Sequence, residues 1–179
     1  MSRDNGQAFA DAKAPRVLIA GMGNVLKYDD GFGVEVARRL LATQNLPANV
    51  TVIEVGIGGI SLVQELLDQY DALLVIDAVQ RHGSPGQIYV LEAEVPNLDD
   101  LAESVRRDFL ADMHYTTPAR AMILAKALGV LPRTVLIVGC QPEVYDDFGL
   151  GLSAPVTAAV EAAVARVNEL LNNLIEKAA

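Results

Sequence analysis

The 179-residue sequence is poor in residues on which several common kinds of protein depend. Its single cysteine, Cys140, excludes an internal disulfide and a zinc site built from several cysteines. Lys and Arg number 14 against 23 Asp and Glu, so the clustered positive charge of a nucleic-acid-binding protein is missing. No apolar run reaches the ~18 residues that span a bilayer. We therefore expect a protein that binds neither nucleic acid nor membrane.

The beginning of the chain differs in composition from the rest. Residues 1–14 are polar and lack the apolar core of a signal peptide, which predicts a flexible tail and a cytoplasmic protein. Residues 15–179 are long enough for one domain with a substantial core. Hydrophobic residues make up 51% of the sequence, which excludes a disordered chain. We predict a single domain without internal repeats.

Strand-like and helix-like patterns alternate along this domain. Mostly apolar runs predict five strands, at residues 17–20, 50–55, 72–78, 87–91 and 135–139. Helical spacing and helix-start signals predict helices at residues 34–41, 60–67, 101–107, 117–128 and 153–177. The turn-rich residues 81–86 are too few for a helical crossover, so the fourth strand is expected to be an antiparallel edge strand. The order predicts an α/β fold, a three-layer α/β/α sandwich with a mostly parallel five-stranded sheet.

Acidic residues follow the predicted strands, at the sheet edge where parallel sheets bind ligands. Residues 21–33 lead from the first strand into a helix predicted to begin near Asp30, and they include the adjacent carboxylates Asp29 and Asp30. A helix start favours ionised carboxylates, which can bind a metal or act as a base, although one Asp could simply cap the helix. Asp77 lies in an otherwise apolar strand, where an unpartnered acid is costly to bury.

The sequence has two histidines, which can be considered one at a time. His82 lies among turn residues and is expected to be exposed, whereas His114 precedes a helix that packs on the sheet. Asp30, Asp77 and His114 could therefore converge at one edge, and their mixed oxygen and nitrogen ligands suit a borderline divalent transition ion. The alternative for Asp77 is a buried acid satisfied by backbone N–H groups.

The sequence also contains features of two other kinds of site. Gly21-x-Gly23 after a strand suggests a dinucleotide site, but the third glycine of that fingerprint is replaced by Leu26. Cys140 follows the last strand and could act as a nucleophile with His114. A lone cysteine after a buried strand is more often a core residue.

The sequence resembles the hydrogenase maturation endopeptidases from about residue 16 to the final helix. The similar segments are residues 21–26 with 29–34, 74–78, 138–143 and 149–153, which occur in the family's order. The resemblance implies a peptidase that removes the C-terminal peptide of a nickel–iron hydrogenase large-subunit precursor after nickel insertion. It also implies metal positions at Asp30, Asp77 and His114, the first of which is often Glu in the family. Ile57 stands in the glycine cluster where the family commonly has threonine, a departure that bears on substrate range.

A mechanism follows as a hypothesis from this resemblance. Asp30, Asp77 and His114 would form an incomplete ligand set, completed by nickel that the precursor carries. A carboxylate such as Asp29 or Glu54 would act as base while the metal polarises the carbonyl or a water. A non-proteolytic nickel-binding maturation chaperone could use the same ligands, so it is the alternative. The oligomeric state stays open, and a monomer is compatible with the sequence.

Overall fold

One sheet organises the part of the chain that the computed structural model describes, residues 14–43, 46–111 and 117–177. Its strands are β1 (Val17–Met22), β2 (Val50–Gly56), β3 (Ala72–Ala78), β4 (Ile88–Glu92) and β5 (Thr134–Cys140), in the order β2-β1-β3-β5-β4. All neighbours pair in parallel except β4 and β5, which are antiparallel. The predicted mostly parallel sheet with an antiparallel edge strand is confirmed.

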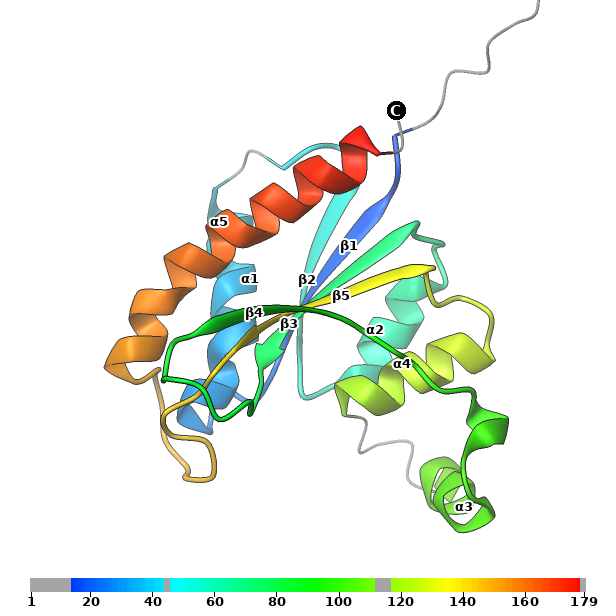
Figure 1. Ribbon diagram of the computed structural model, residues 1–179. Coiled ribbons are helices and arrows are strands. Elements are labelled where there is room, and N and C mark those ends of the chain that lie inside the picture. Colours follow the sequence, from blue (N-terminus) through cyan, green and yellow to red (C-terminus); the bar gives the residue numbers. More distant parts are fainter. Residues whose placement is uncertain (1–13, 44–45, 112–116, 178–179) are drawn as a thin grey trace, which may run out of the picture.

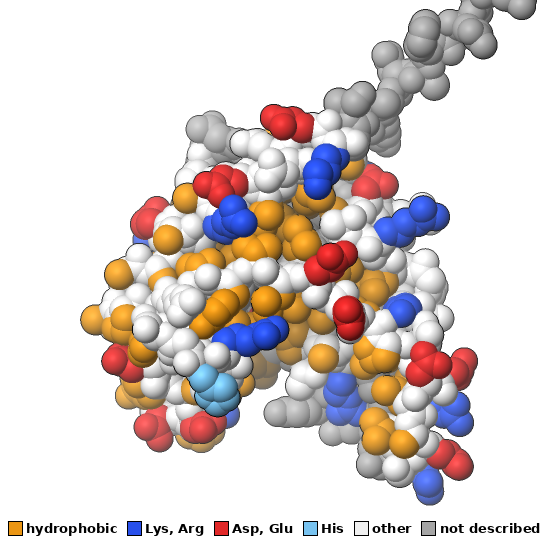
Figure 2. Space-filling model, viewed as in Figure 1, with side chains coloured by type: hydrophobic (Ala, Val, Ile, Leu, Met, Phe, Trp, Pro, Cys, Tyr) orange, Lys and Arg blue, Asp and Glu red, His pale blue; other side chains and the backbone are white. Residues whose placement is uncertain are grey.

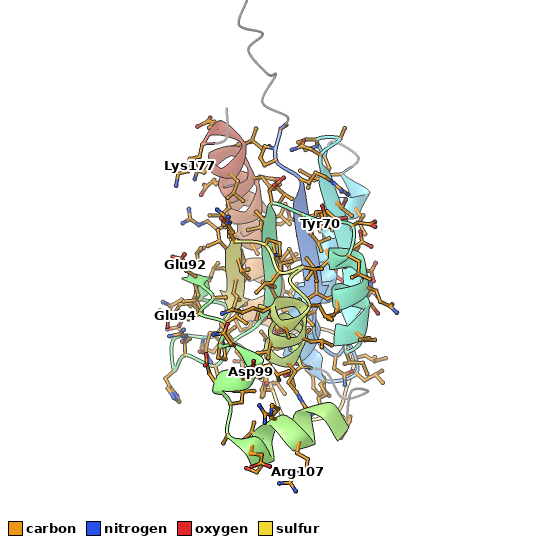
Figure 3. The ribbon with its side chains drawn as sticks, turned by 90° about the vertical axis from the view of Figure 1, so that its right-hand side faces the viewer. Tyr70, Glu92, Glu94, Asp99, Arg107 and Lys177 are labelled. Carbon is orange, nitrogen blue, oxygen red and sulfur yellow. The ribbon has the colours of Figure 1, made fainter. Side chains whose placement is uncertain are left out.

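Helices cover both faces of this sheet (Figure 1). α1 (Phe32–Ala42) and α5 (Ala154–Glu176) lie on one face, and α2 (Gly59–Leu66) and α4 (Pro118–Ala127) lie on the other. α3 (Glu103–Ala111) follows the short η2 (Leu98–Asp100) and lies apart from both layers. Figure 3 shows α3 at one end of the molecule, near the labelled Asp99 and Arg107, with Lys177 at the opposite end. The three-layer sandwich predicted from the sequence is confirmed.

The two central strands are buried on both faces because a hydrophobic core lies on each side of the sheet. Ile19 and Leu74 point toward α1 and α5, whereas Leu18 and Leu73 point toward α2 and α4. Each fully buried side chain of this size contributes about 1.5–3 kcal/mol through removal of its surface from water. This two-sided burial explains why β1 and β3 are continuous apolar runs in the sequence.

The start of α1 is seated directly on the sheet by a glycine. A Cβ atom at Gly33 would lie 2.0 Å from the carbonyl oxygen of Ile76 and 2.4 Å from that of Met22. Only glycine therefore allows the first turn of α1 to touch the backbones of β1 and β3. This contact brings the residues just before α1 to the carboxyl end of β3.

The helix start differs from the prediction. A 3-10 turn, η1 (Tyr28–Gly31), precedes α1, so the α-helix begins at Phe32 and not near Asp30. No side chain caps either helix start, so neither Asp29 nor Asp30 is a cap. The predicted tail lies outside the described residues except for residue 14. No helix of the described residues is both long and apolar enough to cross a membrane.

Candidate functional site

Asp30 and Asp77 meet above the carboxyl ends of β1 and β3, as the strand-end rule predicts. Asp30 lies on η1, and Asp77 is the second-last residue of β3. Gly23 passes between them with a φ of 122°, in a region that side chains rarely adopt. A Cβ atom there would lie 1.7 Å from the carbonyl oxygen of Asp30 and 3.7 Å from Oδ1 of Asp77. The glycine turn therefore serves to bring the two acids together.

The two carboxylates influence each other electrostatically. Burial and then the negative charge of Asp30 raise the pKa of Asp77 to about 7, although its Oδ1 accepts a hydrogen bond from the N–H of Ala78 at 2.9 Å. Burial also raises the pKa of Asp30, opposed by a hydrogen bond from the N–H of Asn24 at 3.0 Å and by the charge of Lys27. A cation between the two acids would offset both the cost of desolvating their charges and the repulsion between them. The pair is therefore a donor set that suits a metal cation.

The alternative predicted for Asp77, a buried acid satisfied by backbone N–H groups, does not account for its raised pKa. A buried carboxylate that backbone N–H groups satisfy fully has a lowered pKa, because those hydrogen bonds favour the charged form. The pKa of Asp77 is instead raised, and one backbone N–H contacts it. A ligand could therefore still stabilise the charged form of Asp77.

The third predicted metal ligand, His114, lies outside the described residues. Within the described ranges, no group of three His, Cys, Asp or Glu side chains is arranged to hold a metal ion. His82 does not complete such a group; it is exposed, as predicted, in a turn with a φ of 57°. The described chain therefore supplies two carboxylates of the predicted set of three.

Asp29 has a different place from the one that a general base needs. It is fully buried, and its carboxylate accepts hydrogen bonds from the N–H groups of Glu143, Val144 and Ser153 and from the hydroxyl of Ser153, at 2.6–2.9 Å. Four donors on two oxygens leave little capacity to accept a proton from a substrate. This placement makes Asp29 the anchor of residues 143–153, and its role as base stays a prediction.

Glu54, the other predicted base, lines an open cleft of about 390 Å³, which Gly23, the residue between the two acids, also lines. Its Oε2 lies 2.9 Å from Nε of Arg38, and both side chains are partly exposed. The rest of the lining comes from the turn after β1, from the end of β2 and the turn after it, and from α1: Gly23, Asn24, Val25, Leu26, Val34, Val55, Gly56, Ile57 and Gly58. A carboxylate that is oriented by an arginine and open to solvent can still reach a substrate or a water.

The Gly21-x-Gly23 turn is not a dinucleotide site in this fold. It leads into η1, and Leu26, at the position of the missing third glycine, is exposed and accepts a hydrogen bond from Gly149 through its backbone. In a dinucleotide site, the turn would open directly into a helix whose first N–H groups bind phosphate. The glycines here position acids, which would repel a phosphate.

The sandwich, the paired carboxylates and the open cleft at the strand ends together define an α/β protein with a candidate acidic site. A family model described as hydrogenase maturation protease, HycI, matches residues 34–170. The hydrogenase expression/formation protein HupD of Rhizobium leguminosarum bv. viciae is 34% identical over 152 residues, which are 84% of this chain and 71% of HupD.

Solved structures agree with these matches. The hydrogenase 2 maturation peptidase from a Thaumarchaeota archaeon is 35% identical, with a TM-score of 0.64, over 88% of this chain and 98% of that one. The hydrogenase maturating endopeptidase HybD from E. coli is 26% identical, with a TM-score of 0.70, over 88% of this chain and 93% of HybD. The chain belongs to the hydrogenase maturation protease family.

The surroundings of Cys140 make it a core residue. It is fully buried between the sheet and α5, and burial, followed by the charge of Asp29, raises its pKa to about 12. The thiolate needed for nucleophilic attack is therefore absent at neutral pH.

A Cys140→Ala variant should process a hydrogenase precursor within about twofold of the wild-type rate and lose about 1 kcal/mol of stability, since only a small side chain leaves the core. Cleavage assays and urea unfolding measure both, and abolished cleavage by the folded variant would contradict this assignment.

Proposed function

We propose that this protein is an endopeptidase that removes the C-terminal extension of a nickel–iron hydrogenase large-subunit precursor and recognises the nickel already inserted there. Family membership supports the peptidase activity. The observation that carries nickel recognition is the pair of Asp30 and Asp77, which lie partly buried at the strand ends, with raised pKa values. The cytoplasmic location and the monomeric state stay predictions.

Nickel enters this proposal as part of the substrate. Two carboxylates alone form a partial ligand set, so the precursor's own ligands keep most of the coordination positions. Docking of the metal between Asp30 and Asp77 converts their repulsion into attraction, which favours a loaded precursor over an empty one. We propose His114, outside the described residues, as the third contributor.

We propose Glu54 as the base, because it lines the cleft beside the acid pair. Water adds to the scissile carbonyl carbon while Glu54 takes a proton from it, and that proton then passes to the leaving amine as the C–N bond breaks. The metal of the substrate can polarise the carbonyl oxygen. The ion pair with Arg38 keeps the side chain of Glu54 oriented toward this step.

Processing of nickel-loaded and nickel-free precursor by the purified protein tests the proposal. We expect a shortened large subunit by mass spectrometry from the loaded precursor, at a rate about a hundredfold above that from the empty precursor, as differential affinity for the two states requires. Equal cleavage of both would overturn nickel recognition and leave the peptidase. Nickel-dependent binding without a change in mass would instead favour the non-proteolytic chaperone.

A further inference from the structure

Several large apolar side chains are exposed at the cleft and on the loop beside it. Val25 and Leu26 are 38% and 57% exposed on the turn after β1, and Phe148 and Leu150 are 78% and 76% exposed on the loop before α5. We call these four residues the apolar rim. Val25 and Leu26 also line the cleft, so the rim extends from the cleft onto the neighbouring loop. An exposed apolar group at the mouth of a site is typical of a binding surface.

The framework that carries the rim is fixed. The N–H of Gly149 donates to the carbonyl of Leu26 at 2.8 Å, and the N–H of Tyr28 donates to the carbonyl of Gly149 at 3.1 Å. The ring of Tyr28 fills the space over Gly149, where a Cβ atom would lie 2.0 Å from Cζ. Tyr28 itself has a φ of 45°, a strained value for a non-glycine residue, and such strain is concentrated at functional sites. The exposed side chains are therefore presented on a rigid base, which lowers the entropy cost of binding.

Acidic side chains accompany the rim. Glu143, Asp146 and Asp147 are exposed on the same loop, and residues 143–153 contain no Lys or Arg. None of the three forms an ion pair within the part of the chain that the structure describes. The ammonium group of Lys27 is instead held 5.5 Å from the ring centre of Phe148. Figure 2 shows acidic and hydrophobic side chains together at the lower left edge, where Figure 1 draws this loop.

From this combination, and resting on the proposed function, we infer that the apolar rim and the acids beside it dock the hydrogenase precursor through a segment rich in apolar and basic side chains. The apolar groups would supply affinity, and the acids would select and steer a positively charged partner. A second copy of this chain is a poor occupant, because it would bring three further acids against the same loop. The surface thus adds a recognition element that does not depend on nickel.

Steady-state processing of nickel-loaded precursor by loop variants tests this inference. The double variant Phe148→Ser with Leu150→Ser should raise the half-saturating precursor concentration about tenfold, with kcat within about threefold, because both side chains act in binding. Asp146→Lys with Asp147→Lys should raise it similarly, and added salt should shrink that effect. Leu128→Ser, at the end of α4, is the matched control: Leu128 is 56% exposed, and its variant should behave as wild type.

The outcomes separate this inference from the proposed function. If the wild type does not shorten the loaded precursor, the proposed function fails. If the wild type is active and both double variants keep its half-saturating concentration, the docking surface is wrong and the proposed function stands. Thermal unfolding of each variant checks that the exposed substitutions leave the fold intact. If the Phe148→Ser, Leu150→Ser variant does not fold, the Asp146→Lys, Asp147→Lys variant decides the outcome.

Discussion

An Asp77→Asn variant is expected to be more stable than the wild type at neutral pH and to lose precursor processing. Processing should fall by about a hundredfold or more, because the variant removes one of the charges proposed to hold the cation of the substrate. The gain in stability has a separate cause. Asn copies the shape of the neutral acid, and its carbonyl oxygen can keep the hydrogen bond from Ala78.

The sign of this stability change follows from linkage. The pKa of Asp77 is about 7 in the folded chain against 3.8 as reference, so folding disfavours the ionised form. Below the reference pKa, both states are protonated and there is no penalty. The penalty grows as the pH rises through this interval and is complete above about pH 7. The difference between the two pKa values of Asp77 corresponds to a penalty of at most about 4 kcal/mol. Structural relaxation should reduce the gain in stability measured for Asp77→Asn to about 1–3 kcal/mol.

Urea unfolding of wild type and variant at about pH 5 and about pH 8 measures this difference, which should be larger at the higher pH. The matched control is Asp68→Asn, which changes an exposed acid and should show no such growth. A variant at position 77 that is less stable than wild type at both pH values would mean that the carboxylate is a satisfied structural group. An active, folded variant would remove Asp77 from the site.

The sequence predicts the central strands well, because their burial on both faces leaves a simple pattern. The range predicted for β3, residues 72–78, is the range observed, and Asp77 within it lies at the site edge as expected. The predicted start of α1, near Asp30, differs from the observed start at Phe32 because the 3-10 turn η1 precedes the helix. This turn depends on contacts with the loop before α5, which the spacing of apolar residues does not encode.

Adjacent acids show where sequence reasoning ends. Asp30 was predicted to bind the metal and its neighbour Asp29 to act as base, and in the structure Asp29 is a buried anchor whereas Asp30 faces Asp77. The difference arises from N–H groups that begin 114 residues further along the chain, and backbone donors carry no sequence signal. His114, the third metal ligand predicted from the sequence, lies outside the described residues, so its role stays a prediction.

Asp29→Ala is expected to destabilise the fold more than the substitution of its neighbour Asp30. Removal of the Asp29 carboxylate leaves the N–H groups of Glu143, Val144 and Ser153 without their acceptor, in hydrogen bonds that are partly buried. Loss of several such partners at once is costly, and we expect a loss of about 3–5 kcal/mol. In Asp29→Asn, the NH₂ group of the side chain would face N–H groups that need an acceptor, so this variant should not restore stability.

Two comparisons make the Asp29 prediction specific. Ser153→Ala removes one of the four hydrogen bonds and should cost about 1 kcal/mol. Asp30→Ala should abolish processing with little loss of stability, because the carboxylate it removes is one whose charge the fold disfavours. Urea unfolding, and limited proteolysis within residues 143–153, measure the structural effects, and precursor cleavage under conditions where each variant is folded measures the functional ones. If Asp29→Ala is as stable as wild type but inactive, the assignment of anchor and ligand to these neighbouring acids is reversed. A carboxylate that accepts four hydrogen bonds cannot be removed without cost, whereas a carboxylate that awaits a cation can.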